Sequence, residues 1–538
     1  MNMRRVFPAV MVALLASLTS AHAAAQPTDM FSISGTVVNA KEGGPLSKVR
    51  LVVSDVRNSE NLQSLLTGED GRFKFRVRAG KYSLQAAKRG YISSAYNQHE
   101  QYSTAIVAGA GLNSENLKFR MSPAAVLSGK VLDDAGDPVR DASITLYRED
   151  HRSGVSRIRT FRKSKTDDQG YYEFTPLEDG TYFISAMATP WYAFRPSRGE
   201  GKIEGADENP SLDVAYPITF YAGATESDEA TPIPIRGGDR LDVDIHLAPV
   251  PALHFVFHVD GDPTRAFQTP VLQKPVFDGF DYVQSGDVRM LSPGTYESAG
   301  VAAGRYVIGT QGGEGRDSEI ELANDGQEIE NAPQTPAVEV RASVQVAGEN
   351  VLPAKLELAL RNSNQKLAAW SSVDEKGNAS FAVVPGRYVV LAGSPGKAYS
   401  VARISFGGVQ TAGRLINVPT ASTLNLSLTL VGGAVTVEGV AKRASQPVPG
   451  AMIVLIPKDP ETDKDMFRRD QSDSDGSFAL QGVIPGTYTI IAIEDGWDLD
   501  WAKPGVIAGY GRNGRSVTIG SQETGTLKLK QPIEVQPK

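Results

Sequence analysis

The chain has 538 residues, a formal net charge of −7, 53 Gly, 32 Pro and no Cys. The negative charge argues against nucleic acid as a partner, and the lack of Cys excludes disulfides and a thiol nucleophile. At roughly 100 to 150 residues per domain, this length predicts about four or five domains. Because no disulfide can staple them, each domain must be large enough to bury a core of its own.

Residues 1–25 have the pattern of a secretory signal peptide. Arg4 and Arg5 precede an apolar run, Val6–Leu18, and small residues suited to cleavage follow around Ala23. The apolar run is too short for a stable membrane span. We therefore expect an exported protein, periplasmic or extracellular, with no transmembrane segment in its mature chain.

The first unit, residues 31–122, contains a turn-strand-turn-strand pattern. An Asp-Gly turn at Asp70-Gly71 opens a run in which apolar and basic residues alternate, and Gly80-Lys-Tyr82 starts the next strand. Alternation at period two places the apolar side chains on one buried face of a sheet. Asp, Gly and Pro at the turns supply the backbone conformations that tight turns need.

Four further units repeat this pattern at domain-sized spacing: residues 123–250, 251–334, 335–431 and 432–538. The last unit holds the fullest version, from Asp473 to Ile490. The Gly-x-Tyr step recurs at five tyrosines, Tyr82, Tyr182, Tyr306, Tyr388 and Tyr488, which we expect to pack in or cap the core. About seven short strands per unit predict an all-β fold, a tandem array of about five antiparallel β-sandwiches. The short linkers allow an extended rod or a compact cluster.

The order of the motifs carries a family resemblance. Each well-matched unit has Gly-x-Val near its start, Pro-Val or Pro-Leu before an apolar strand, an acidic Gly-containing turn before a Phe or Tyr strand, and then Gly-x-Tyr. This series resembles the carboxypeptidase regulatory-like domain, a transthyretin-like β-sandwich similar to starch-binding modules. The match is good for 31–122, 123–250 and 432–538, weaker for 335–431 and poor for 251–334. The resemblance implies noncatalytic modules of the kind found in multi-domain bacterial exported proteins that lack a peptidase domain.

Motifs for catalysis or metal binding are incomplete. No His is followed three residues later by Glu, so the ligand set of a zinc metallocarboxypeptidase is missing. The acidic turns do not complete an EF-hand loop, and Asp in a turn is explained by bonds to its own backbone. The Gly-rich stretch Gly509–Gly514 precedes a strand-like run, so we interpret it as a loop and not as a dinucleotide site. We therefore predict no enzyme activity, no cofactor and no metal, and a zinc peptidase stays a disfavoured alternative.

A basic stripe is the first candidate binding surface. Arg72, Lys74, Arg76 and Arg78 occupy alternate positions opposite the apolar face of their strand. The first unit carries a net charge of +6, whereas the next two units carry −8 each. The stripe is either a solvated face that discourages edge pairing or a contact for an anionic partner.

Aromatic residues form the second candidate surface. They lie in a long insertion, residues 190–230, and in the last unit; the candidates are Trp191, Tyr192, Tyr216, Tyr221, Trp497 and Trp501. Exposed rings stack on sugars, whereas buried rings would cap the sandwiches. The sequence therefore predicts a noncatalytic structural or binding protein with a protein or cell-envelope partner, and carbohydrate binding through these rings is the alternative.

Overall fold

The computed structural model describes residues 29–194, 209–258, 270–283, 287–292, 295–310, 318–329, 337–348, 351–362, 367–395, 397–406, 409–411, 414–420, 423–432, 435–461, 463–520, 523 and 525–538. The predicted signal peptide, residues 1–25, lies outside this range, as does the middle of the predicted insertion at 190–230.

The first unit is a sandwich of two sheets. One sheet has the strand order β4-β1-β8, and the other has the order β3-β2-β5-β6, with β7 also pairing with β5. Strand β1 runs antiparallel to β4 and parallel to β8. The bounds are β1 (Phe31–Asn39), β2 (Arg50–Asp55), β3 (Leu62–Leu66), β4 (Arg72–Val77), β5 (Gly80–Ala87), β6 (Ser94–Ala95), β7 (Ile106–Ala108) and β8 (Leu117–Met121).

The second unit repeats this topology. Its sheets have the orders β12-β9-β17 and β11-β10-β13-β15, while β18 pairs with β9 and β16 pairs with β13. The bounds are β9 (Ala125–Leu132), β10 (Ser143–Asp150), β11 (Arg157–Lys165), β12 (Tyr171–Leu177), β13 (Gly180–Met187), β14 (Val214–Ala215), β15 (Thr219–Phe220), β16 (Ile233–Ile235), β17 (Arg240–Asp242), β18 (Ile245–His246) and β19 (Val250–Pro251). Two 3-10 helices, η1 (Pro210–Leu212) and η2 (Ser227–Glu229), lie within it.

The third unit keeps the same order, with one added edge strand, β23, although its sequence match is poor. Its sheets are β23-β24-β20-β27 and β22-β21-β25-β26, and β27 again runs parallel to the opening strand β20. The order in which the strands pair is therefore retained in a unit whose sequence motifs are weak. The bounds are β20 (Leu253–His258), β21 (Pro270–Val276), β22 (Gly279–Tyr282), β23 (Asp287–Ser292), β24 (Thr295–Val301), β25 (Gly304–Thr310), β26 (Ser318–Leu322) and β27 (Gln327–Ile329).

In the fourth and fifth units the two sheets are linked into continuous ribbons, β30-β29-β32-β33-β36-β28-β31 and β38-β37-β45-β42-β39-β40. The fourth unit has β28 (Val338–Val346), β29 (Glu357–Asn362), β30 (Leu367–Ser372), β31 (Asn378–Val383), β32 (Gly386–Ser394), β33 (Lys397–Phe406), β34 (Val409–Thr411), β35 (Leu415–Val418) and β36 (Thr423–Gly432). The fifth has β37 (Val435–Arg443), β38 (Gln446–Pro447), β39 (Met452–Pro457), η3 (Lys464–Met466), β40 (Arg468–Gln471), β41 (Ser477–Val483), β42 (Gly486–Ile493), η4 (Gly496–Asp498), α1 (Pro504–Gly511), β43 (Arg515–Ile519), β44 (Thr526–Lys528) and β45 (Ile533–Gln536).

The predicted all-β class and tandem sandwich architecture are confirmed. The expected loop at Gly509–Gly514 is wrong in part, because α1 extends to Gly511. Pro504 stands at the first turn of this helix, where its missing N–H costs no hydrogen bond.

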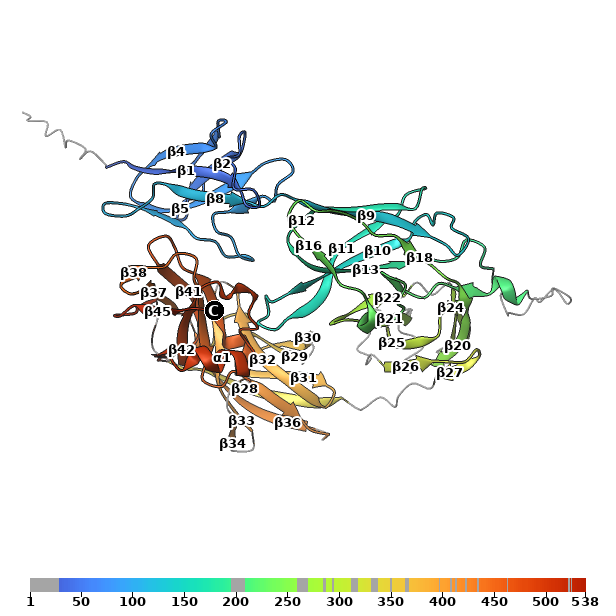
Figure 1. The fold of residues 1–538 in the computed structure, drawn as a ribbon. Helices are drawn as coiled ribbons and strands as arrows, with labels where there is room; N and C mark the ends of the chain where they lie inside the picture. The colour runs from blue at the N-terminus through green and yellow to red at the C-terminus, as the bar shows by residue number, and fades with distance from the viewer. Residues whose placement is uncertain are drawn as a thin grey trace, which may run out of the picture.

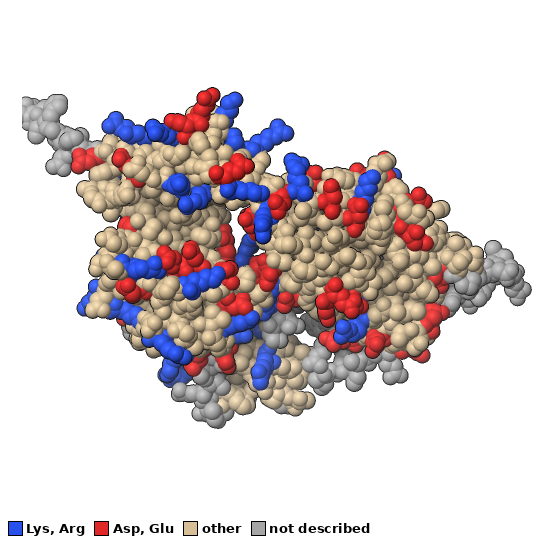
Figure 2. All heavy atoms as spheres, viewed as in Figure 1, with Lys and Arg blue, Asp and Glu red and all other residues tan. Residues whose placement is uncertain are grey.

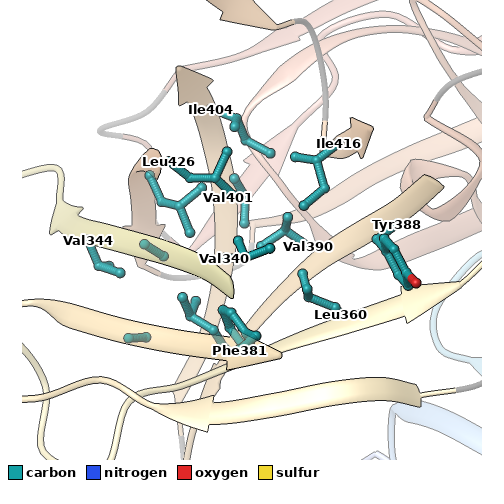
Figure 3. Close-up of a cluster of buried hydrophobic side chains, with 14 of the residues drawn as sticks. Val340, Val344, Leu360, Phe381, Tyr388, Val390, Val401, Ile404, Ile416 and Leu426 are labelled. Carbon is teal, nitrogen blue, oxygen red and sulfur yellow. The ribbon is translucent and has the colours of Figure 1, made fainter. Parts of the chain in front are cut away.

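Alternating burial builds each core. In β28 every second residue from Val338 to Val346 is buried, because side chains of a strand point alternately to its two faces. Figure 3 shows Val340 and Phe381 from one sheet facing Leu360 and Val390 from the other. Burying one such side chain contributes about 1.5–3 kcal/mol.

The five Gly-x-Tyr tyrosines are all buried, as expected. Each donates a hydrogen bond from its hydroxyl to the backbone carbonyl four residues earlier, at 2.7–3.0 Å. The ring fills the core while its polar end closes the preceding turn, so the same residue serves the same purpose in every unit.

The last unit folds back onto the first two. In Figure 1 the first unit, in blue, lies above the last unit, in red, and the second unit lies beside both. Hydrogen bonds join residues that are more than 340 positions apart, such as Ser156 to Asp500 and Glu100 to Arg469. Of the two arrangements that the linkers allow, the structure has the compact one.

Candidate interdomain joint and binding surfaces

The turn that opens β41 is built differently from its counterparts in other units. In the second and fourth units the first Asp of the turn, Asp167 or Asp374, accepts hydrogen bonds from two backbone N–H groups of its own turn. In the last unit Asp475 accepts the N–H of Ser477 at 2.9 Å instead. This frees the carboxylate of Asp473 for contacts outside its turn.

Asp473 uses that freedom to hold the first unit. Its carboxylate accepts hydrogen bonds from the Lys81 ammonium at 2.6 Å and from the Ala105 N–H at 3.0 Å. The neighbouring Ser474 donates its N–H to the Ala105 carbonyl, and its hydroxyl accepts the Val107 N–H at 2.8 Å. The turn thus docks along β7 in the manner of a short added strand.

Burial changes the acidity of this turn region. It raises the pKa of the Asp473 carboxyl, an effect that the Lys81 ammonium partly offsets. Burial also raises the pKa of Asp470 to about 6, although its carboxylate accepts the Ala479 N–H at 2.7 Å. Asp470 therefore titrates close to neutral pH.

A buried ion pair lies next to this turn. Arg469 donates to both carboxylate oxygens of Glu100, at 2.6 and 3.2 Å, and the two side chains are 3% and 13% exposed. The guanidinium also lies 4.4 Å from the ring centre of Trp501 and 5.3 Å from that of Tyr102. A bidentate pair stacked on aromatic rings is a geometry that Arg provides and Lys does not.

Rings and amides complete the contact between the first and last units. The imidazole of His99 stacks on Trp497, with ring centres 5.0 Å apart and planes 4° apart. Its Nδ1 lies 3.1 Å from the Gln471 side chain, whose amide donates to the Asn97 carbonyl and to the Thr104 hydroxyl. The buried Gln471 is thereby satisfied from the first unit.

The second unit contacts the last through a turn after β10. Asp500 accepts the Ser156 N–H at 2.6 Å and lies 3.0 Å from Nδ1 of His151. Ala502 donates its N–H to the Gly154 carbonyl at 2.8 Å. A Cβ on Gly154 would lie 2.4 Å from that of Ala502, so only glycine allows this approach.

The second and third units are also joined. Phe277, before β22, contacts three aromatic rings of the second unit at centre-to-centre distances of 4.8–5.6 Å, those of Tyr147, Phe183 and Phe220. Beside it the buried Asp281 accepts from the Tyr147 hydroxyl and, at 2.8 Å, from Lys163. Lys274, itself buried, pairs with Glu226 at 2.9 Å.

The predicted basic stripe lies on the surface of the first unit. Arg72, Lys74 and Arg76 are exposed on β4, whereas the apolar residues between them are buried, and Arg78 is exposed just after the strand. Only Arg72 has an acidic neighbour in the same strand region, Asp70 at 3.7 Å.

Pairing of β1 with β8 extends this stripe into a basic face. Strand β8 presents Lys118 and Arg120 to solvent on the same side as Arg72 to Arg76, with the hydroxyls of β1 between the two rows. We define the basic face as Arg72, Lys74, Arg76, Lys118 and Arg120. Strands β1, β4 and β8 contain no Asp or Glu. In Figure 2 basic side chains are frequent on the first unit, whereas acidic ones are frequent over the second and third.

The candidate aromatic residues fall into different environments. Trp191 is 87% exposed and lies edge-on to Tyr192, with ring centres 5.7 Å apart. Tyr216 is buried in the core of the second unit, and Tyr221 packs partly buried against it. Of the two alternatives for the aromatic residues, Trp497 and Trp501 follow the buried one: they are 9% and 7% exposed because the first and second units cover them.

Sequence reasoning did not single out the charged residues of the joint. Glu100, Arg469 and Asp500 stand in polar surroundings where a local pattern predicts solvated charges. A usable signal was the second aspartate of the turn, Asp475, which accepts the backbone N–H of Ser477.

The described residues hold neither a metal cluster nor a membrane-spanning helix. That part of the chain contains no group of three or more His, Cys, Asp or Glu side chains arranged to hold a metal ion. His254 pairs with Asp213 and His258 with Glu328. No described helix is long and apolar enough to cross a membrane.

Comparisons with solved structures find matches at low sequence identity and low TM-score. The chain is similar to the Bacillus anthracis TIE protein, with 10% identity, 74% of each chain covered and a TM-score of 0.18. It is also similar to BcpA, the major pilin subunit of Bacillus cereus, with 10% identity, 75% of this chain and 99% of BcpA covered, and a TM-score of 0.15. A third similar structure is GBS52, the minor pilin of Streptococcus agalactiae, with 14% identity, 44% of this chain and 100% of GBS52 covered, and a TM-score of 0.21. A search of curated proteins finds no match.

The family comparison is more informative for the N-terminal part of the chain. Residues 32–121 match the model of the carboxypeptidase regulatory-like domain. This range coincides with β1 to β8, the sandwich that carries the basic face. The match to the carboxypeptidase regulatory-like domain therefore spans the whole first unit.

Proposed function

We propose that this protein is an exported, noncatalytic structural and binding protein, periplasmic or extracellular, whose first unit holds an anionic component of the cell envelope. The observation that carries the proposal is the basic face, which gathers five cationic side chains and no acidic one on three strands. Basic residues on alternate positions of a strand stand about 6.7 Å apart, and the two rows are separated by about 10 Å. Such a grid suits a repeating anionic surface.

The contacts of the first unit with the last leave this face free. They are made by Lys81, His99, Glu100 and the segment from Thr104 to Val107, which belong to β5, β7 and the loop between them. The remainder of the chain then acts as a rigid support that presents the face to its partner.

The test is cosedimentation of the full mature chain with anionic lipid vesicles and, separately, with an insoluble anionic polysaccharide at low salt. Each basic residue near an anionic surface contributes about 1 kcal/mol, so replacing Arg72, Lys74 and Arg76 together by Gln should weaken binding roughly a hundredfold. The contribution of these basic residues to binding should also fall as the salt concentration is raised.

The matched control removes three exposed basic residues elsewhere, Arg159, Lys165 and Arg240, and should bind as the parent does. If both triple variants lose the same affinity, binding depends on the net charge of the chain and not on the basic face. Absence of binding to either anionic material at low salt contradicts the proposed function.

A second candidate function rests on Trp191. This ring is 87% exposed with Tyr192 beside it, which is the environment of a sugar-stacking platform. Replacing Trp191 by Ala should abolish any binding to neutral polysaccharides. Unchanged retention on polysaccharide columns would remove this candidate.

A further inference from the structure

A groove of about 450 Å³ opens where the first, second and last units meet. The first unit contributes Gln101 and Tyr102, the second contributes Arg152, and the last contributes Arg468 to Asp470. Its size falls within the range of small-molecule sites in proteins. Because three units form its wall, the groove exists only while the joint is closed.

Cationic groups dominate the lining of the groove. Arg469 is fixed by Glu100, and Arg468 is held by bonds to the Gly482 and Phe467 carbonyls. Arg152 differs from both. Its backbone is anchored, since its carbonyl accepts from Arg469 at 3.2 Å, but its exposed guanidinium has no partner among the described residues.

The charges of the groove point to a ligand with one negative charge. Arg469 is paired with Glu100 and Arg468 is held by the Gly482 and Phe467 carbonyls, so Arg152 supplies the guanidinium that is left for a ligand. A single carboxylate pairs with one guanidinium in a bidentate geometry.

The other polar groups suit hydroxyls. Gln101 and Gln481 present exposed amides that can both donate and accept. The Asp470 carboxylate is positioned by the Ala479 N–H and offers a further acceptor. Amides, a carboxylate and a free guanidinium around one groove are the groups that recognise a hydroxylated acid.

We propose that this groove binds a carboxylated saccharide unit, with Arg152 paired to the sugar carboxylate and the two glutamine amides bound to its hydroxyls. This site is separate from the basic face. Since ligand contacts would come from three units, binding would also favour the closed joint.

The experiment titrates the full mature chain with a trisaccharide that carries a single galacturonate unit, with neutral galactotriose as the comparison ligand, and follows tryptophan fluorescence and calorimetric heat. Trp501 lines the groove, so saturable binding should change the emission. We expect saturable binding of the acidic trisaccharide only, weakened at least tenfold by Arg152→Gln. The matched control Arg157→Gln alters an exposed basic residue of the same unit and should bind normally.

Three results would overturn the proposal: no saturable binding by the parent protein, equal binding of the neutral trisaccharide, or unchanged binding by Arg152→Gln. A fourth measurement tests whether the ligand binds in the groove or on the basic face. The variant lacking Arg72, Lys74 and Arg76 must retain trisaccharide binding, and its loss would assign the ligand to the basic face instead.

Discussion

Replacing Glu100 by Gln is expected to release the last unit from the first. The carboxylate of Glu100 accepts two hydrogen bonds from Arg469, and both side chains are largely hidden from solvent. Glutamine keeps the shape of the side chain but removes its charge. The guanidinium then remains beside Trp501 in a buried site without a counterion.

The expected cost follows from this geometry. Removing one partner of a buried ion pair typically costs about 3–5 kcal/mol. Glu100 retains a small exposed fraction, so we expect the lower end, about 3 kcal/mol, which corresponds to roughly a hundredfold shift in docking. The double variant with Arg469→Met buries no charge and should recover much of the loss, because the penalty comes from the orphaned guanidinium.

Hydrogen exchange provides a local measurement of docking. The N–H groups of Ala105 and Val107 donate to Asp473 and Ser474, so the segment 104–108 should exchange faster in Glu100→Gln. Urea unfolding gives the global stability, and Glu115→Gln serves as an exposed control in the same unit. An exchange rate equal to that of the parent, with stability changed by less than about 0.5 kcal/mol, would refute the reasoning.

Two further predictions concern buried polar groups. The pKa of Asp470 lies above its usual value, so its contribution to stability is full below about pH 4 and is lost as the pH rises through 6. Asp470→Asn should therefore stabilise the protein at pH 7.5 by up to about 3 kcal/mol and have little effect at pH 4, as urea unfolding at both pH values will show. Tyr306→Phe loses its bond to the Ala302 carbonyl and should cost about 1 kcal/mol in thermal unfolding, whereas Tyr282→Phe, at an exposed ring, should cost nothing measurable.

Local alternation made the sandwiches predictable. The burial of Phe73, Phe75 and Val77 and the exposure of the basic residues between them follow from period-two geometry alone. The role of the Gly-x-Tyr tyrosines was predictable for a similar reason, since each one bonds to its own chain four residues earlier. Both features depend on residues that are close in sequence.

Features that depend on distant pairing could not be predicted. Lys118 and Arg120 join the basic face only because β8 runs parallel to β1, a pairing that no local pattern encodes. Trp497 and Trp501 have the composition of a sugar platform, yet they are buried by units that lie more than 300 residues earlier in the chain. An aromatic residue at a loop indicates a contact, and the sequence does not say with what.

Differences between repeated turns are the signal that remains usable. The first unit has Gly68 at the position that Asp473 occupies in the last unit. The turn of the first unit is capped by Asp70, which accepts the Arg72 N–H at 3.1 Å. One capping carboxylate per turn is therefore sufficient. The last unit carries two: Asp475 accepts the backbone N–H of the turn, and Asp473 pairs with Lys81 across the joint. When a turn in a repeat holds a second polar residue besides the one that caps it, that second residue is a candidate for contact with another unit.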